Sequence, residues 1–178
     1  MFTLVSGGAA SGKSEYAESL VLSCPPEVRY YIATMMPFDD ECRARIAKHR
    51  AMRAGKGFET VECPLKLGFV GLPKRGTVLL ECLGNLAANE LYALDGAGDG
   101  ALTAVVSGIE SLLAQCRDLV VVTNDVFSGG NRYADDTDRY LRLLAAANRA
   151  LAQRADAVCE VVCGLPYYHK GGGNLARF

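Results

Sequence analysis

Hydrophobic and polar residues follow two alternating patterns along this chain. Short apolar runs rich in β-branched residues predict strands near residues 2–5, 28–33, 77–81, 119–123 and 157–163. Longer segments with helical patterns predict helices near residues 13–23, 39–53, 101–116 and 135–154. Such alternation is typical of an α/β fold whose sheet is largely parallel and flanked by helices. Open sheets of this kind bind ligands where their strands end, so the informative loops are those after Val5, Ile32, Leu80 and Val122.

The length of 178 residues fits a single domain spanning residues 1–178. The glycine-rich segment 95–100 reads as a flexible connection, and three glycines at 171–173 begin a loose tail. Charged residues make up 22% of the chain and the formal net charge is -1, so no global attraction for nucleic acid is expected. Any anion site must therefore be local.

The cysteine pattern and the start of the chain bear on its location. Seven cysteines are odd in number and include no Cys-x-x-Cys pair, which disfavours a zinc site or a redox dithiol and favours reduced thiols. The opening apolar run lacks the basic start and the length of a signal peptide. No apolar run approaches the ~20 residues that span a bilayer. We expect a cytoplasmic protein without a membrane span.

A phosphate-binding motif lies between the first predicted strand and the first predicted helix. The pattern Gly-x-x-x-x-Gly-Lys-Ser/Thr is satisfied by Gly7, Gly8, Ala9, Ala10, Ser11, Gly12, Lys13 and Ser14. Small residues let the backbone N–H groups curl toward phosphate oxygens, and the start of the helix adds partial positive charge. Lys13 would neutralise the β- and γ-phosphates, while Ser14 would hold Mg²⁺. The motif predicts a P-loop that binds a nucleoside triphosphate, without choosing among kinases, GTPases, ATPases and nucleotidyltransferases.

The predicted helix at 39–53 begins with acids and ends with bases. Part of this order is ordinary complementarity to the helix dipole, and a solvated face with i,i+4 ion pairs would explain it. However, Arg45, His49 and Arg53 recur every four residues and so share one face. Such a stripe could clamp a polyphosphate with its arginines and offer a neutral imidazole to phosphorus as a nucleophile.

Acidic residues end two predicted strands. Glu81 follows the run at 77–80, and Asp125 follows the run at 119–124. Either carboxylate could bind Mg²⁺ or hydrogen-bond the sugar or base of a nucleotide, and either could be a solvent-facing loop residue. Glu62, after the short run at 58–61, carries a weaker signal, and His169 reads as a surface histidine.

Several segments together carry a family resemblance that covers nearly the whole chain. They are residues 5–18, 31–34, 39–50, 60–62, 79–83, 122–126, 155–158 and 164–166. In these segments the sequence resembles the bifunctional adenosylcobinamide kinase / adenosylcobinamide-phosphate guanylyltransferases of cobalamin synthesis. Two positions depart from that pattern: Lys48 stands where some members have another histidine, and segment 127–133 differs from a longer, proline-bearing one.

The resemblance implies two reactions. A nucleoside triphosphate, ATP or GTP, would phosphorylate the terminal hydroxyl of adenosylcobinamide. His49 would accept GMP from GTP as a covalent phosphoramidate, and adenosylcobinamide phosphate would take that GMP to give adenosylcobinamide-GDP. The nucleotide contacts implied by position, besides the P-loop, are Ala33, Thr34, Met35, Arg50, Ala51, Met52, Arg53, Glu62 and Glu81. The resemblance also implies a homotrimer whose subunit contacts shape the site.

Two other functions remain compatible with the residues alone. In an ordinary small-molecule kinase the arginine stripe would serve as a phosphate clamp, and no covalent intermediate would form. In a regulatory GTPase the P-loop would bind GTP and signal to a protein partner. A trapped covalent nucleotide would separate the bifunctional enzyme from both.

Overall fold

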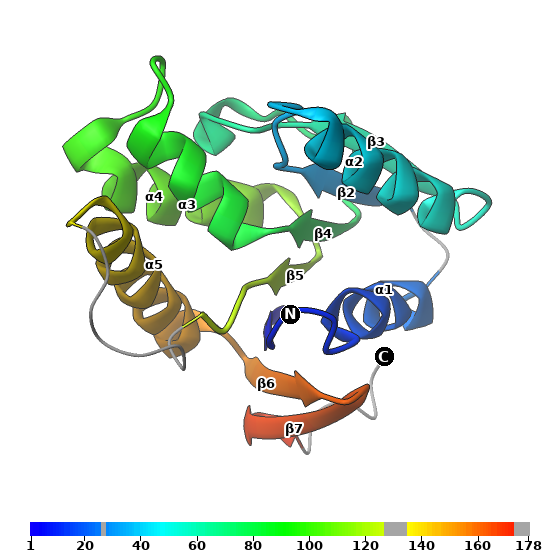
Figure 1. Cartoon of the computed structure of the whole chain (residues 1–178). Helices are drawn as coiled ribbons and strands as arrows, with labels where there is room; N and C mark the ends of the chain where they lie inside the picture. Colours follow the sequence, from blue (N-terminus) through cyan, green and yellow to red (C-terminus); the bar gives the residue numbers. More distant parts are fainter. Residues whose placement is uncertain (26–27, 127–134, 173–178) are drawn as a thin grey trace.

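A computed structural model describes residues 1–25, 28–126 and 135–172. In this part of the chain seven strands form one sheet in the order β3-β2-β4-β5-β1-β6-β7 (Figure 1). They are β1 (Phe2–Ser6), β2 (Arg29–Ala33), β3 (Phe58–Glu62), β4 (Thr77–Glu81), β5 (Asp118–Val122), β6 (Ala157–Val162) and β7 (Leu165–Lys170). Neighbouring strands pair in parallel up to β6, and β7 is antiparallel to β6. The predicted α/β fold with a largely parallel sheet is confirmed.

Helices connect the parallel strands. They are α1 (Lys13–Ser23), α2 (Asp40–Arg53), α3 (Leu83–Tyr92), α4 (Ala101–Gln115) and α5 (Asp135–Arg154), with 3-10 turns at Leu67–Phe69 and Gly98–Gly100. All four helices and five strands that the sequence predicts are present, with ends within one residue of the prediction. The sequence did not predict α3 and β7, and it marked β3 only as a short run.

Helices cover both faces of the sheet. On one face, alternate strand residues such as Leu4, Ile32 and Leu80 pack against α3, α4 and α5. On the other face, the intervening residues, among them Val5 and Val122, pack against α1. Because both faces are buried, the central strands are nearly continuous apolar runs, as expected for a parallel sheet. Figure 1 shows α1 on one side of the sheet and the group α3, α4 and α5 on the other.

Helix α2 differs from the other connections. It is capped by Asp39, whose carboxylate accepts the N–H of Cys42 at 2.7 Å, and it runs for 14 residues. Arg53, in its last turn, is its one buried residue. A helix with a single buried side chain adds little hydrophobic stabilisation, so α2 is held mainly at its C-terminal end.

Two expectations from the sequence fall mainly outside the described residues. The departing segment 127–133 lies outside them, as does the tail expected from about residue 171, apart from its first two residues. The segment at 95–100 forms turns and the short 3-10 helix Gly98–Gly100.

Candidate active site

A cavity of about 700 Å³ opens at the carboxyl edge of the sheet. Its walls come from the loops after β1, β2, β4 and β5, which are the four loops that the sequence marked, and from α2. The lining residues are Ala9, Ala10, Ser11, Gly12, Lys13, Ser14, Glu15, Tyr31, Ala33, Met35, Arg45, Ile46, Lys48, His49, Met52, Arg53, Glu62, Glu81, Cys82, Asn85, Asn124, Asp125 and Val126. This volume is within the range of small-molecule and cofactor sites.

The P-loop is held in its curled shape by its own backbone and by two neighbouring loops. The N–H of Ser11 donates to the carbonyl of Gly8 at 3.3 Å, which closes the turn. The N–H of Asp125, after β5, donates to Gly7 O at 3.0 Å, and the N–H of Gly164, in the β6–β7 turn, donates to Ser11 O at 2.8 Å. The cradle is therefore fixed before any ligand binds.

Gly12 is the residue at which the P-loop becomes a helix. It is the N-cap of α1 with φ of 88°, a left-handed conformation that side chains disfavour. A Cβ built on Gly12 would lie 3.1 Å from Gly164 Cα, so the close approach of the β6–β7 turn is a second reason for a glycine at residue 12. The free N–H groups in the first turn of α1 then face the cavity, where they can bind phosphate.

Lys13 and Ser14 project from that first turn. Lys13 Nζ donates to Gly8 O at 2.9 Å, which holds the ammonium over the cradle. Ser14 Oγ donates to Glu81 Oε1, so the serine of the motif meets the acid at the end of β4. Hydroxyl and carboxylate oxygens are hard ligands of the kind that Mg²⁺ prefers, and P-loop enzymes use this pair of residue types to hold it. The two residues fit a magnesium ion.

The predicted stripe on α2 faces the cavity. Arg45, His49 and Arg53 all line it, together with Lys48 and Met52. Arg45 is exposed and forms an i,i+4 ion pair with Glu41 at 2.5 Å, as a solvated face would. Arg53 is 7% exposed and its guanidinium carbon lies 3.7 Å from the centre of the Tyr31 ring. The ion pair of Arg45 is what a solvated helix face would show, while the placement of the stripe at the cavity is compatible with the predicted role in binding phosphate.

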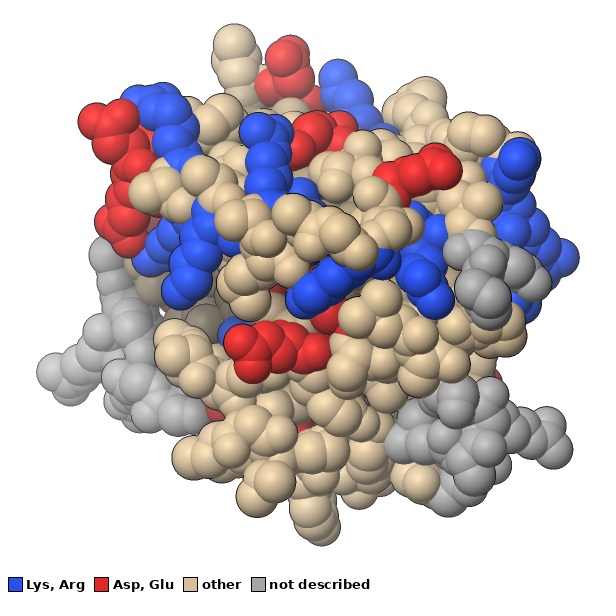
Figure 2. Space-filling view, turned by 90° about the vertical axis from the view of Figure 1, so that its right-hand side faces the viewer, with Lys and Arg blue, Asp and Glu red and all other residues tan. Residues whose placement is uncertain are grey.

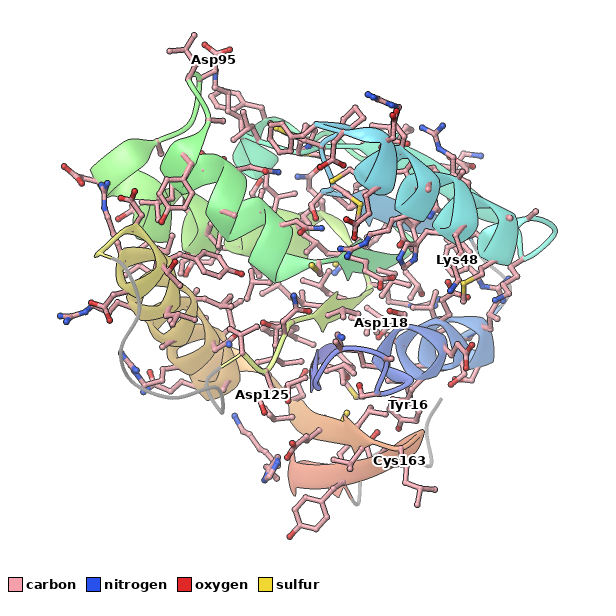
Figure 3. All side chains as sticks on the ribbon, in the orientation of Figure 1. Tyr16, Lys48, Asp95, Asp118, Asp125 and Cys163 are labelled. Carbon is pink, nitrogen blue, oxygen red and sulfur yellow. The ribbon has the colours of Figure 1, made fainter. Side chains whose placement is uncertain are left out.

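Basic side chains gather over this part of the surface. Figure 2 shows the side of the molecule on which α2 lies, with Lys and Arg in a band across its upper and middle part. In Figure 3, Lys48 lies on α2 above α1 and Asp125 follows β5, whereas Asp95 marks the tip of a distant loop. Since the whole chain carries a net charge of -1, the positive charge is local, as a polyphosphate site requires.

The structure brings most of the sequence-predicted residues to the cavity, but not all. Gly7, Gly8, Thr34, Arg50 and Ala51 are not among the lining residues. Thr34 is buried, and its Oγ1 donates to Cys82 O at 2.8 Å and accepts from Cys82 N at 2.7 Å. Arg50 pairs with Glu62 at 2.7 Å. Thr34 thus joins β2 to the end of β4, and Arg50 orients a carboxylate that does line the site.

Several lining residues were missed by the sequence reasoning, and the polar ones among them include Tyr31, Asn85 and Asn124. Tyr31 Oη donates to Glu81 Oε2 at 2.8 Å. Burial first, and the adjacent Glu81 charge second, raise the pKa of Tyr31 above its ordinary value. Its position two residues before Ala33, on the same face of β2, was the available signal. Asn85 belongs to α3, the helix that was not predicted.

Other side chains from the sequence analysis lie away from this chemistry. His169 is exposed and its Nε2 lies 3.3 Å from Glu160, so its prediction as a surface residue is confirmed. The seven cysteines are free thiols, five of them buried. Among the described residues no group of three His, Cys, Asp or Glu could hold a metal ion, and no helix is long and apolar enough to cross a membrane.

Comparison with known proteins gives a consistent result over nearly the whole chain. The model of the family "Cobinamide kinase / cobinamide phosphate guanyltransferase" matches residues 3–168. The bifunctional adenosylcobalamin biosynthesis protein CobU of Salmonella typhimurium is 37% identical, over 93% of this chain and 97% of its own. The protein CobP of Pseudomonas aeruginosa, with the same description, is 33% identical over 96% and 98%.

Solved structures match in fold alone. One of them, an ATPase domain, has a TM-score of 0.50 at 11% identity, covering 89% of this chain and 68% of that one. A KaiC-like protein of Pyrococcus horikoshii has a TM-score of 0.50 at 12% identity, covering 89% and 71%.

Proposed function

This chain belongs to the cobinamide kinase / cobinamide phosphate guanyltransferase family, and we propose that its guanylyl transfer passes through GMP bound covalently to His49. The family establishes a bifunctional enzyme of cobalamin biosynthesis with a corrinoid substrate. The proposal concerns how the two reactions share one site. The observation that carries it is the single cavity lined by both the P-loop and His49.

In the guanylyl step, a ring nitrogen of His49 attacks the α-phosphorus of GTP. A nitrogen–phosphorus bond forms, the bond from the α-phosphorus to its bridging oxygen breaks, and pyrophosphate leaves. A phosphate oxygen of adenosylcobinamide phosphate then attacks the same phosphorus and releases the imidazole, giving adenosylcobinamide-GDP. Lys13, Arg45 and Arg53 line the cavity and can stabilise the negative charge that develops on the phosphates.

In the kinase step, the terminal hydroxyl of adenosylcobinamide attacks the γ-phosphorus of ATP or GTP. An oxygen–phosphorus bond forms, the bond from the γ-phosphorus to its bridging oxygen breaks, ADP or GDP leaves, and the hydroxyl proton passes to a nearby base. Asp125 lines the cavity and is the candidate for that base, because both oxygens of Glu81 already accept hydrogen bonds, from Ser14 and Tyr31. Lys13 and the N–H groups of the P-loop bind the β- and γ-phosphates. Ser14 and Glu81 would hold Mg²⁺, which supplies positive charge at the phosphates when bound.

The assembly and location belong to the same proposal. We expect a homotrimer in the cytoplasm whose neighbouring subunits help to shape the corrinoid site. Light scattering of the purified protein measures the mass of the assembly, and a monomer at working concentration would contradict this part without touching the chemistry.

The covalent step is tested by labelling. GTP carrying label at the α- or the γ-phosphate is incubated with the protein, which is then denatured. The α-label should stay on the chain in alkali and leave in acid, because a phosphorus–nitrogen bond is weakened when its nitrogen is protonated. The γ-label should not stay by this route. A serine or tyrosine ester would survive mild acid.

The sequence offers a matched control, because it contains two histidines. His49→Asn should lose the α-label and guanylyl transfer, yet still bind GTP and phosphorylate adenosylcobinamide. His169→Asn, at an exposed position away from the cavity, should keep both the label and the transfer. A His49→Asn protein that still takes α-label, or still makes adenosylcobinamide-GDP near the parent rate, would remove His49 as the nucleophile.

A further inference from the structure

Tyr31 lies at the centre of β2 and contacts two residues that line the cavity, Glu81 and Arg53. Its hydroxyl donates to Glu81 Oε2 at 2.8 Å, while the other oxygen of Glu81 accepts from Ser14. The face of its ring carries the guanidinium of Arg53 at 3.7 Å. Its ring also meets Phe58 edge to face, with centroids 6.0 Å apart and an interplanar angle of 82°. One side chain thus contacts the acid of β4, the last turn of α2 and strand β3.

The hydrogen bond to Glu81 fixes a carboxylate that would otherwise rotate. A hydroxyl that donates to an ionised carboxylate makes a charge-assisted bond, stronger than a neutral one. With Oε2 occupied by Tyr31, Oε1 stays directed at Ser14.

The contact with Arg53 fixes the end of α2. Arg53 is the one buried residue of α2, and its Nη2 also donates a hydrogen bond to Thr60 Oγ1 at 3.4 Å. A guanidinium stacked over an aromatic face gains both cation–π attraction and apolar contact. His49 lies four residues before Arg53, one turn away on the same face. The position of its imidazole therefore depends on where the Tyr31 ring holds Arg53.

We propose that Tyr31 is a positioning residue with two separable effects, in which its hydroxyl orients Glu81 for the metal and its ring sets the position of His49 through Arg53. The second effect rests on the proposed function of His49, whereas the first does not. The two effects belong to different atoms of one side chain, so different substitutions should separate them.

The test uses Tyr31→Phe, which keeps the ring, and Tyr31→Leu, which removes both groups. Tyr30→Phe is the matched control, because Tyr30 is the adjacent residue of β2 on the opposite face, and its hydroxyl accepts from Lys74 N outside the cavity. The first readout is calorimetric binding of a GTP analogue whose α–β bridging oxygen is replaced by CH₂, with and without Mg²⁺. This probe cannot guanylylate the protein.

Mg²⁺ should raise the affinity for the analogue, and in Tyr31→Phe this increase should be about tenfold smaller than in the parent. A tenfold loss is about the scale found when a group that orients a metal ligand is removed. Its binding without Mg²⁺ should match the parent, as should both values for Tyr30→Phe. An unchanged Mg²⁺ effect in Tyr31→Phe would overturn the role of the hydroxyl. A merely structural role would weaken binding equally with and without Mg²⁺.

The second readout is the rate at which α-label from GTP appears on the protein at saturating Mg²⁺. Tyr31→Phe should label near the parent rate, and Tyr31→Leu should be slower by about tenfold or more, because small misplacements of a reacting group are costly. If Tyr31→Leu fails to fold, Arg53→Lys keeps the charge but loses the planar stack and should show the same slow labelling. Equal labelling rates in Tyr31→Phe and these variants would overturn the role of the ring.

Failure of the covalent mechanism gives a different result. A parent protein that takes no α-label would end the proposal for His49 and, with it, the role of the Tyr31 ring. The Mg²⁺ dependence of analogue binding would still test the hydroxyl.

Discussion

The P-loop and helix α2 both line the cavity, but they are joined to the fold in different ways. The P-loop follows β1, in which all residues but the last are buried, and it receives backbone hydrogen bonds from two other loops. It leads into α1, whose Ala17 and Val21 are completely buried. Helix α2 has one buried residue, Arg53, and its other side chains are exposed or only partly buried. The phosphate cradle is thus anchored to the core at both ends, whereas the proposed nucleophile lies on an element that the core barely contacts.

This difference predicts how substitutions act in the two regions. Changes that disturb the backbone of the P-loop should affect stability and catalysis together, because the same backbone serves both, whereas removal of a side chain that points into the cavity should affect catalysis alone. Changes on α2 should affect the chemistry, or the helix alone, with little effect on global stability. The predictions below test that contrast, beginning with the largest expected effect.

Replacing Lys13 with alanine should cost the kinase step roughly 10²-fold or more in rate, because its ammonium stabilises charge on the transferring phosphoryl group. Folding should survive, since Lys13 makes its hydrogen bond to a loop carbonyl at the cavity. Turnover on adenosylcobinamide measures the effect, and Lys74→Ala, at an exposed position, is the control. Parent-like turnover in Lys13→Ala would remove the P-loop from the mechanism.

Gly12→Ala should lower the free energy of unfolding by about 2–4 kcal/mol, since it adds left-handed strain and a close contact with Gly164. Gly55→Ala, just beyond α2, is the matched variant: its φ is 79°, but a Cβ there meets no atom within 4 Å. Only the strain applies, so about 1–2 kcal/mol is expected. Denaturant unfolding gives both values, and equal losses would mean that the β6–β7 turn does not brace the P-loop.

Glu81→Gln keeps the size of the side chain but removes its charge. GTP affinity should fall by about 1–3 kcal/mol, the scale of a hydrogen bond to a charged group. The contact with Ser14 indicates that the loss should appear in the presence of Mg²⁺, whereas a contact with guanine would lower affinity without Mg²⁺ as well. Glu59→Gln, on the exposed edge strand β3, should bind as the parent does. Equal GTP affinity in Glu81→Gln and Glu59→Gln would show that the charge of Glu81 does not contribute to GTP binding.

The same contrast explains what the sequence could and could not predict. The P-loop could be predicted because its determinants are local: a strand, a glycine turn and a helix follow one another in the sequence. The apolar strands could be predicted for the same reason. Most of the cavity followed from the rule that parallel strands end at one edge, which brought Glu81 to Ser14 across 67 positions of sequence.

The sequence analysis missed α3 because polar residues stand at buried positions of this helix. In the folded protein these residues form hydrogen bonds with other parts of the chain. Asn89 donates to Thr34 O at 2.8 Å and to Pro64 O at 2.9 Å, and Glu90 accepts the N–H of Lys66 at 2.6 Å. These residues interrupt the apolar face on which a sequence-based prediction depends. Strand β7 was missed because it is an exposed edge strand that contains Pro166. The contact of Arg53 with Tyr31 likewise joins separate elements, and charged residues ordinarily predict a solvated position.

The smallest expected effect concerns the cap of α2. Asp39→Ala removes the carboxylate that accepts the N–H of Cys42, so the helix should open more readily from its N-terminal end. Amide exchange in the first turns of α2 should be about fivefold faster, while exchange in α1 stays as in the parent. Asp95→Ala, at a distant loop tip, should leave both helices unchanged (Figure 3). Equally faster exchange in α1 and α2 would show that α2 is part of the core after all.

The pH dependence of this effect has a defined sign. The backbone N–H of Cys42 holds the pKa of Asp39 below its ordinary value of 3.8, because it stabilises the ionised carboxylate. A carboxyl whose pKa is lowered by folding stabilises the structure above its unfolded pKa and loses that effect as the pH falls through the folded one. The difference in α2 exchange between the parent and Asp39→Ala should therefore be complete above pH 3.8 and shrink below it. A difference that persists unchanged in stronger acid would mean that the charge of the cap is not what holds the start of α2.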